Sequence, residues 1–277
     1  MNLEKFINYA LAEDIGDGDH TSLACIKTEH TGKAQLLVKE NGIVAGVDLA
    51  KQIFFIVDSK LQIEILKNDG DSIAINENVL TVEGNAQSIL KAERLVLNCM
   101  QRMSGIATLT AKYVNELKGL STRLLDTRKT TPLCRTIEKW AVRIGGGHNH
   151  RFGLYDMIMI KDNHIDYAGG IAPAIERTAA YLKLHKKNIA IEIETRNLEE
   201  VKQVLQIGNV QRILLDNMQP ALLKEAVLLI NKKFETEASG GITLETIRQY
   251  AETDVDFISV GALTHSVKSL DLSLKAY

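Results

Sequence analysis

The hydrophobic and polar positions of residues 1–117 predict helices around a small sheet. Apolar residues at helical spacing indicate helices at 3–12 and 47–57, with a polar loop at 13–21. Short runs with strand character predict strands at residues 34–38, 42–45, 61–66 and 79–83. A long helix is expected at 86–117, interrupted near Ser104 and Gly105 and bridging two domains.

From residue 123 onward, short apolar runs alternate with helical patterns. The apolar runs predict six strands, at residues 123–125, 157–160, 189–193, 212–215, 235–238 and 257–260. Helices are expected between them, near residues 135–143, 170–186, 197–206, 220–231 and 243–251. Such alternation is typical of a parallel sheet, and its regular spacing favours a barrel with six of the usual eight strands. Alternating leucines at 269–277 predict a strand that returns to the first domain.

Composition excludes several classes of protein. A chain of 277 residues that is 45% hydrophobic and 25% charged can bury a sizeable core. The first twenty residues mix charged and apolar positions, which predicts neither a signal peptide nor a membrane anchor, so a cytoplasmic location is expected. The three cysteines form no CxxC pair, which argues against a disulfide framework and a zinc ribbon.

Positive charge is concentrated in one part of the chain. Seven Lys or Arg residues and only two acids lie between Arg123 and Arg151, although the whole chain has a net charge of −2. A local excess within an acidic chain indicates a site for small carboxylates or phosphates, whereas a nucleic-acid-binding protein usually has a broad basic face. We therefore expect a small-anion pocket and no nucleic-acid partner.

Polar residues or glycines follow each of the six predicted barrel strands. In parallel barrels, the catalytic residues lie at the C-terminal ends of the strands. The expected rim segments are 126–129, 161–163, 192–194, 215–217, 238–241 and 260–262. Their convergence on one rim is stronger evidence for a site than any one motif.

Two glycine-containing segments indicate a phosphate site. Ser239, Gly240 and Gly241 precede a helix expected near Thr243, and a second segment, 260–262, ends the next strand. Glycine allows the backbone to approach an anion, and the amides at a helix N-terminus bind it. Each segment alone would be an ordinary turn.

Glu194 and Asp216 end neighbouring predicted strands. These carboxylates could hold Mg²⁺, directly or through water, or accept hydrogen bonds from ribose hydroxyls. The alternative is a buried salt bridge with Lys161. Of Glu192 and Glu194, only Glu194 is expected to face the site.

The cations divide by chemistry. Arg128 and Arg151 offer planar guanidinium groups suited to carboxylates, whereas Lys129 and Lys161 suit phosphates. A solvated charged surface is the alternative. That alternative, or a structural ion pair, is the better interpretation for three cations at helical spacing, Arg135, Lys139 and Arg143.

The pair His148 and His150 could bind zinc if it lay on a strand. Three glycines precede the pair, and no matching set of His and Asp residues follows the other strands. A hydrogen bond from His150 to a bound anion is therefore the preferred interpretation.

Several long motifs resemble, in order and spacing, those of the quinolinate phosphoribosyltransferase family. They occupy residues 126–132, 138–139, 145–147, 150–151, 161–164, 192–194, 215–217 and 239–241, with further matches at 13–14 and 18–21. One departure is that Leu133 and Cys134 follow Pro132, where the family is expected to have Gly and an apolar residue. The departure leaves the conformation of this loop open.

The resemblance implies a fold and an assembly. It implies an N-terminal α/β sandwich domain, residues 1–112 with the returning segment 267–277, and an incomplete parallel α/β barrel, residues 113–266, as in type II phosphoribosyltransferases. It also implies a homodimer, or a larger oligomer, in which Arg102 of one protomer reaches the site of its partner.

The resemblance also assigns residue roles. The implied quinolinate ligands are Arg128, His150, Arg151, Lys161 and the partner's Arg102. The implied ligands of phosphoribosyl diphosphate are Lys129, Lys161, Glu194, Asp216, Ser239, Gly241, Gly261 and His265. The neighbouring residues Thr127, Gly240, Val260 and Ala262 complete the expected substrate-binding set, and Lys129, Lys161, Glu194 and Asp216 are the expected catalytic residues.

The implied reaction joins quinolinate to 5-phosphoribosyl 1-diphosphate and gives nicotinate mononucleotide, diphosphate and CO₂. Mg²⁺ would accompany the diphosphate substrate at Glu194 and Asp216, and no organic cofactor is expected because the alkylated pyridine nitrogen itself stabilises the electron pair left by CO₂.

Three alternative functions are weighed against this reaction. The first is a related phosphoribosyltransferase with another acceptor, which is expected to lack the segment 161–164. The second is a metal-dependent barrel hydrolase that uses His148 and His150. The third, a catalytically silent binding protein, is disfavoured because Lys161, Glu194 and Asp216 are all present.

Overall fold

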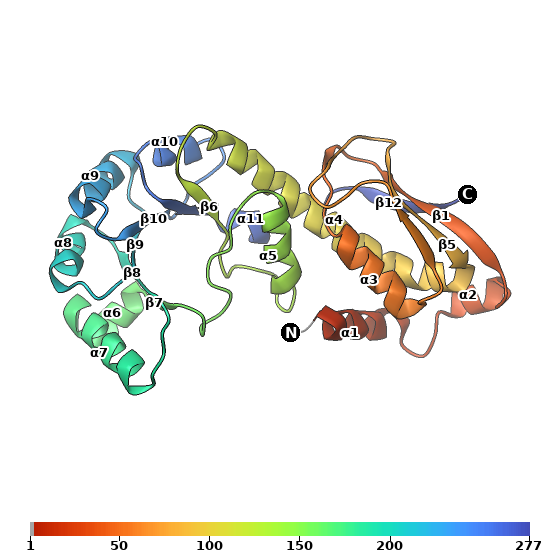
Figure 1. Ribbon diagram of the computed structural model, residues 1–277, viewed down its shortest axis with the longest axis horizontal. Helices are drawn as coiled ribbons and strands as arrows, with labels where there is room; N and C mark the ends of the chain where they lie inside the picture. The colour runs from red at the N-terminus through yellow and green to blue at the C-terminus, as the bar shows by residue number, and fades with distance from the viewer. Residues whose placement is uncertain (1–2) are drawn as a thin grey trace. The chain divides into compact units, whose positions relative to one another are not determined.

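The computed structural model describes residues 3–277, which form two compact units (Figure 1). The first unit comprises the chain up to Ala111 together with Thr130–Gly146 and Ala262–Tyr277, and the second comprises Lys112–Lys129 and Gly147–Gly261. The expected barrel domain, 113–266, thus differs from the second unit, because two of its segments pack with the first. One reason is the ion pair between Arg102 and Glu138, which ties the segment from Thr130 to the first unit.

The first unit is built on a four-stranded antiparallel sheet in the order β12-β1-β5-β3. Its strands are β1 (Thr31–Val38), β3 (Gln62–Ile65), β5 (Asn78–Asn85) and β12 (Leu272–Ala276), and a separate two-stranded sheet pairs β2 (Gly42–Ile43) with β4 (Ser72–Ile73). Alternate residues of β1, namely Ala34, Leu36 and Val38, are buried, as expected for a sheet with one face on the core. The predicted C-terminal strand is confirmed, because β12 pairs with β1.

Residues 3–116 form four helices: α1 (Leu3–Ile15), α2 (His20–Cys25), α3 (Val47–Val57) and α4 (Ala86–Glu116). The loop expected at 13–21 is shorter than predicted, since α1 continues to Ile15 and α2 begins at His20. Asp19 caps α2 by accepting a hydrogen bond from the Ser22 N–H at 3.1 Å. Asp19 therefore marks the start of a helix within the segment that was expected to be a loop.

Helix α4 is continuous, so the interruption expected near Ser104 and Gly105 is wrong. A Cβ atom at Gly105 would lie 2.2 Å from the main-chain oxygen of Lys268. The glycine thus lets another segment of the first unit pack directly against the helix backbone, and the helix tolerates it. The Ser104 hydroxyl is buried and accepts the Ala45 N–H at 2.9 Å.

The second unit contains a six-stranded parallel sheet in the order β6-β11-β10-β9-β8-β7. Its strands are β6 (Arg123–Leu125), β7 (Ile158–Ile160), β8 (Ile191–Thr195), β9 (Arg212–Asp216), β10 (Glu235–Ser239) and β11 (Phe257–Ser259). Each strand pairs with its successor and the last pairs with the first, except that β6 and β7 are not paired. This is the topology of an incomplete six-stranded parallel barrel, as predicted, and it is open between β6 and β7.

Helices alternate with these strands along the chain (Figure 1). They are α5 (Arg135–Ile144), α6 (Asp162–Ala168), α7 (Ile171–Leu184), α8 (Leu198–Ile207), α9 (Pro220–Ile230), α10 (Ile247–Ala251) and α11 (Ala262–His265), of which α5 and α11 belong to the first unit. Helix α6 was not expected, because its polar sequence lacks an apolar stripe. Helix α10 begins at Ile247, four residues later than Thr243, after a turn in which the Thr246 hydroxyl accepts the Thr243 N–H at 3.0 Å.

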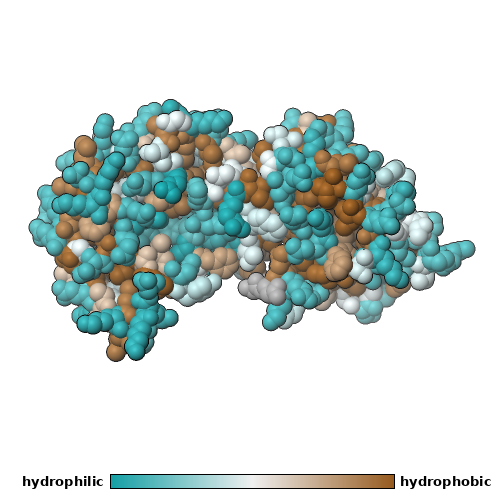
Figure 2. Space-filling view, viewed as in Figure 1, coloured by the Kyte–Doolittle hydropathy of each residue, from teal (hydrophilic) through white to brown (hydrophobic). Residues whose placement is uncertain are grey.

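Among residues 3–277, no helix is both long and apolar enough to span a membrane. The longest, α4, has 31 residues and carries charged residues along its length. Figure 2 shows hydrophilic residues spread over both units, with hydrophobic residues scattered among them.

Candidate functional site

The C-terminal ends of the parallel strands carry most of the residues expected in the site. Thr127, Arg128 and Lys129 follow β6, and Lys161 follows β7. Glu194 lies on β8, and the remaining rim residues end or follow β9, β10 and β11: Asp216, Ser239, Gly240, Gly241, Val260 and Gly261. The second unit therefore brings these residues to one edge of its sheet.

Four of these polar side chains form two contacts between neighbouring strands. The Lys161 Nζ lies 3.8 Å from the Glu194 Oε2, and the Ser239 hydroxyl donates to the Asp216 Oδ1 at 2.8 Å. Burial raises the pKa of Glu194, and the nearby Asp216 carboxylate raises it further, while Lys161 lowers it. Two carboxylates thus lie close together beside one lysine, with Glu194 buried and Lys161 exposed.

Backbone conformation explains the glycines after β10. Gly240 and Gly241 have φ angles of 97° and 63°, in the region that favours glycine. A Cβ atom at Gly240 would lie 2.2 Å from the Asn217 Oδ1, so a side chain cannot be accommodated there. Because α10 begins only at Ile247 and has five residues, any anion at this turn would bind the turn itself, and not a helix N-terminus as expected from the sequence.

Arg128 and Arg151 lie close enough to repel each other. Burial lowers the pKa of Arg151, and the charge of Arg128 lowers it further. The Arg151 guanidinium also donates to the main-chain oxygen of Met157 at 3.2 Å. Two neighbouring guanidinium groups, of which Arg151 is buried and Arg128 half-buried, are suited to a dicarboxylate. Lys129, by contrast, is exposed.

Asp126, which begins the first expected rim segment but has no expected role as a ligand, organises the segment that carries His150. Its side chain is fully buried and accepts the His150 N–H at 2.8 Å and the Asn149 side-chain N–H at 2.6 Å. The main chain of His148 also pairs in parallel with Leu125 of β6. The segment after the three glycines therefore extends the open edge of the sheet at β6.

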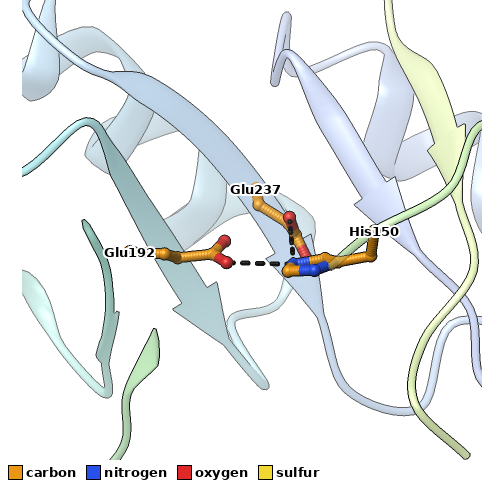
Figure 3. A group of neighbouring side chains, drawn as sticks. All are labelled: His150, Glu192 and Glu237. Atoms are coloured by element: carbon orange, nitrogen blue, oxygen red, sulfur yellow. Dashed lines mark ion pairs between the residues drawn. The ribbon is translucent and has the colours of Figure 1, made fainter. Parts of the chain in front are cut away.

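The side chain of His150 lies between two buried glutamates, as Figure 3 shows. Its Nε2 atom is 2.9 Å from the Glu192 Oε2 and 3.3 Å from the Glu237 Oε2. Its Nδ1 atom accepts the Arg151 N–H at 2.6 Å. Both ring nitrogens therefore face groups of the protein, and the hydrogen bond from His150 to a bound anion stays a prediction.

The protonation of this cluster follows from burial and charge. Burial lowers the pKa of His150, but its contacts with Glu192 and Glu237 outweigh this effect and raise it to about 9. Burial and the charge of Glu237 raise the pKa of Glu192 to about 7. Burial raises the pKa of Glu237, but its contacts with His150 outweigh this effect and lower it. The cluster as a unit thus holds, near neutral pH, a proton that isolated side chains would release, and Glu237 is its ionised member.

Glu192 faces the same side of the sheet as Glu194, so the expectation that only Glu194 faces the site is wrong. Residues two apart on a strand point to one face. Side chains from β8 and β10 meet although β9 lies between them, which requires one common face. The same period of two in the β10 sequence could have identified Glu237.

Arg212 of β9 supplies the counter-charge to these acids. Its NH1 donates to the Glu237 Oε2 at 2.9 Å, and its guanidinium lies over the Phe257 ring at 4.0 Å from the centroid. Arg212 also bonds Glu235, which is half exposed and does not contact His150 in any ion pair of the described chain.

Metal-binding potential differs between the two carboxylate pairs. Within residues 3–277, the one group of three or more potential ligands comprises His150, Glu192 and Glu237, and it excludes His148. Glu194 and Asp216 do not form such a group, but two carboxylates suffice for Mg²⁺ that arrives with substrate phosphates and water. The donor set therefore fits a magnesium ion shared with the substrate.

Three expected site residues lie in the first unit: Arg102, Ala262 and His265. Arg102 donates from Nε and NH2 to the Glu138 Oε1 at 3.1 and 2.9 Å, and its NH1 donates to the Val267 oxygen at 3.2 Å. His265 is exposed, and its Nδ1 lies 2.6 Å from the Ser266 hydroxyl. Arg102 is therefore held by its own chain in this structure.

The loop after Pro132 adopts a conformation that suits glycine. Leu133 has a φ angle of 66°, and its side chain is 77% exposed. This left-handed conformation costs a non-glycine residue about 1–2 kcal/mol. The loop thus turns as a glycine would allow, although this chain has leucine there.

The sequence matches models of both domains of one family. Residues 19–104 match the N-terminal domain and residues 106–275 the C-terminal domain of quinolinate phosphoribosyl transferase. The "Quinolinate phosphoribosyltransferase [decarboxylating] 2, mitochondrial" of Nicotiana glauca is 49% identical over 99% of this chain and 82% of its own length. The "Probable nicotinate-nucleotide pyrophosphorylase [carboxylating]" of Bacillus subtilis is 44% identical over 99% of this chain and 93% of its own.

Solved structures agree with this similarity. The structure of NadC from Streptococcus pyogenes superposes with a TM-score of 0.93 at 37% identity, covering 99% of this chain and 95% of that chain. The nicotinate-nucleotide pyrophosphorylase of Francisella tularensis gives 0.91 at 39% identity, with 99% and 96% covered.

Proposed function

The chain belongs to the quinolinate phosphoribosyltransferase family, and from this premise we propose how its residues carry out the reaction. It transfers the phosphoribosyl group of 5-phosphoribosyl 1-diphosphate to quinolinate and releases CO₂ and diphosphate, giving nicotinate mononucleotide. The structural observation that best supports our assignment of residues is the single rim that carries both Arg128 with Arg151 and Glu194 with Asp216. Quinolinate is a dianion and phosphoribosyl diphosphate carries a hydroxylated sugar, so each pair has a matching substrate.

Arg128 and Arg151 are proposed to bind the carboxylates of quinolinate. Each guanidinium can donate two parallel hydrogen bonds to one carboxylate. A bound dianion would also remove the repulsion between the two arginines that lowers the pKa of Arg151. Binding of this kind fixes the pyridine nitrogen relative to the sugar, which lowers the entropic cost of the attack.

The phosphoribosyl group is proposed to bind along the neighbouring strand ends. Glu194 and Asp216 would accept hydrogen bonds from the ribose hydroxyls, with Asp216 oriented by Ser239. The turn at Gly240 and Gly241 and the segment 260–262 are proposed to bind the phosphate. A Cβ atom at Gly241 would meet no atom within 4 Å, so the backbone there is open to an anion. Lys129 and Lys161 are exposed and can reach the diphosphate.

Magnesium is proposed to bind with the diphosphate at Glu194 and Asp216. When bound, the ion stabilises the negative charge that develops on the leaving diphosphate. Lys161, 3.8 Å from Glu194, contributes positive charge at the same place.

Loss of CO₂ follows from the charge created by the first step. As the bond from the ribose C1 to diphosphate breaks, the pyridine nitrogen forms a new bond to C1 and becomes positively charged. The C2 carboxylate then leaves as CO₂, its bonding electron pair stays on C2 beside the positive nitrogen, and a proton completes the ring. The residues of this chain hold the second carboxylate while the first is lost.

The assembly and the location are proposals as well. We propose a homodimer in which Arg102 serves the partner's site; the 25% exposure of its side chain leaves it some access to solvent. A cytoplasmic location remains the expectation from the sequence, while plant relatives are named mitochondrial or chloroplastic.

Incubation with phosphoribosyl diphosphate, Mg²⁺ and one of two acceptors tests the proposed substrate. Quinolinate should give nicotinate mononucleotide, whereas nicotinate should give little, because it lacks the second carboxylate that the paired arginines bind. Equal turnover of the two acceptors would favour the alternative of a related phosphoribosyltransferase with a different acceptor.

A further inference from the structure

The buried glutamates Glu192 and Glu237 have no part in the mechanism above, and we propose that they are positioning residues for quinolinate. They would act by holding the imidazole of His150 and, through its ring, the main chain of Arg151. The inference rests on the proposed function, because Arg151 is there a ligand of quinolinate.

The Nε2 side of the ring fixes its position. Its distances to the Glu192 and Glu237 oxygens are 2.9 and 3.3 Å, and both glutamate side chains are fully buried. A nitrogen between two carboxylate oxygens carries a proton, so the ring is an N–H donor on this side. Because the acids come from β8 and β10, two strands of the sheet determine where the ring lies (Figure 3).

The Nδ1 atom of the ring connects it to the main chain of Arg151 by a hydrogen bond. Nδ1 accepts the Arg151 N–H at 2.6 Å, so in this geometry the ring proton lies on Nε2. The proton that the raised pKa values of His150 and Glu192 hold near neutral pH is therefore shared between Nε2 and the acids that face it. The His150 N–H is in turn fixed by Asp126 at 2.8 Å. The backbone at His150 and Arg151 is thus held by hydrogen bonds from buried groups before a ligand arrives, and the direction of the Arg151 side chain follows from it.

Charge balance gives the acids a second effect on Arg151. Its pKa is lowered by burial and by Arg128, but the nearby Glu192 carboxylate opposes this shift. Arg212 donates to Glu237, whereas Glu192 and Asp156 are the acids whose charge acts on Arg151. A rim with two adjacent guanidinium groups needs such a counter-charge while it is empty.

The same three side chains meet the geometric requirement of a metal site, but their surroundings favour the ion-pair network. Arg212 binds Glu237 at 2.9 Å, and a guanidinium at a ligand oxygen repels a metal cation. Each ring nitrogen of His150 also has a protein partner: the two glutamates face Nε2, and the Arg151 N–H donates to Nδ1.

The substitutions Glu192→Gln and Glu237→Gln test the proposal, because glutamine keeps the size of the side chain and removes its charge. We expect KM for quinolinate to rise about tenfold in each variant, the effect of one weakened charge-assisted hydrogen bond, with kcat and KM for phosphoribosyl diphosphate changed less than about twofold. Glu235→Gln is the matched control, since Glu235 shares Arg212 with Glu237 but is half exposed, and it should leave all three constants unchanged.

A double-mutant cycle separates positioning through His150 from a general loss of stability. In the His150→Gln background, Glu192→Gln should cause little further change in KM for quinolinate, because the connection to Arg151 is already broken. Three results would overturn the proposal. The first is additive effects of the two substitutions, and the second is an equal rise of KM for quinolinate and KM for phosphoribosyl diphosphate. The third is a stoichiometric metal that the wild type retains and Glu237→Gln loses. A wild-type protein that forms no nicotinate mononucleotide would contradict the proposed function instead.

Discussion

Individual side chains of the rim divide into ligands and residues that hold the ligands. Lys161 is exposed, Arg128 is half-buried and Arg151 is 9% exposed, whereas Asp126, Glu192 and Glu237 are fully buried. A buried charge is stable only with partners, and each of these acids has one: Asp126 accepts the His150 N–H, and the two glutamates contact its ring. The ligands and their supports are therefore expected to differ in their kinetic effects.

Arg128→Ala and Arg151→Ala should each lower kcat/KM for quinolinate by about a hundredfold or more. Each substitution removes a bidentate, charge-assisted contact, worth roughly 3 kcal/mol when its partner stays buried. Arg143→Ala is the control, because Arg143 is an exposed cation of α5 in the same basic stretch. Steady-state kinetics, with circular dichroism to confirm the fold, measures the difference; kinetics equal to the control in both variants would contradict the pocket.

The loop after Pro132 offers a test of backbone strain at a single position. Leu133→Gly should raise the free energy of unfolding by about 0.5–1 kcal/mol, since the relief of the left-handed conformation exceeds the entropy lost with glycine. Leu154→Gly is a suitable control, because Leu154 is 70% exposed and lies outside the set of positive-φ residues. Chemical denaturation monitors both variants, and a loss of stability in Leu133→Gly would show that the side chain contributes more than the strain costs.

At the scale of elements, glycine allows the backbones of helices α4 and α5 to approach each other closely in the first unit. Gly145, at the end of α5, has an ordinary φ of −75°, so its lack of a side chain matters for space and not for conformation. A Cβ atom there would lie 2.5 Å from the Ala107 main-chain oxygen of α4. Glycine is therefore required by the approach of the two helices.

Gly145→Ala should destabilise the protein by about 1–3 kcal/mol, the usual cost of overpacking a contact that cannot relax. Gly32→Ala provides the comparison, because its added methyl would meet only the Ala86 Cβ at 3.6 Å, an ordinary contact. Differential scanning calorimetry should show a lower Tm for Gly145→Ala alone. Equal Tm values for the two variants would mean that the helices separate without cost.

The elements show what the sequence could and could not predict. Strand β6, Arg123–Leu125, was predicted to the residue because an apolar run ends abruptly at Asp126. Helix α6 was missed because Asp162, Asn163 and His164 have no apolar periodicity; the His164 Nδ1 instead caps it by accepting the Lys161 N–H at 2.9 Å. Local patterns determine the strands, whereas caps depend on side-chain geometry.

The candidate site was predictable in the same uneven way. Residues at strand ends, such as Lys161 and Asp216, follow from the parallel sheet. Glu192 and Glu237 could have been found from the period of two along β8 and β10, but their meeting at His150 depends on strands that are distant in sequence. The bonds of Arg102 to Glu138 could not have been predicted, since 36 residues separate them.

For the whole molecule, the proposed exchange of Arg102 between protomers predicts that two inactive variants restore each other. Arg102→Gln and Lys161→Gln should each be nearly inactive alone. After mixing under conditions that exchange subunits, hybrid dimers regain one intact site, so activity should approach about a quarter of the wild-type value. The pair Arg102→Gln and Glu194→Gln should recover activity in the same way. Native mass spectrometry confirms that hybrid dimers have formed. If such hybrids show no recovered activity, Arg102 does not act in the partner's site.

The most direct test of the whole account follows the carbon that the reaction removes. Quinolinate labelled with ¹³C in the C2 carboxylate is incubated with phosphoribosyl diphosphate, Mg²⁺ and the wild-type protein, and labelled CO₂, diphosphate and nicotinate mononucleotide are measured. Equal amounts of the three products are predicted. Nucleotide that retains the label, or no nucleotide at all, would contradict the assignment of this chain as a decarboxylating phosphoribosyltransferase.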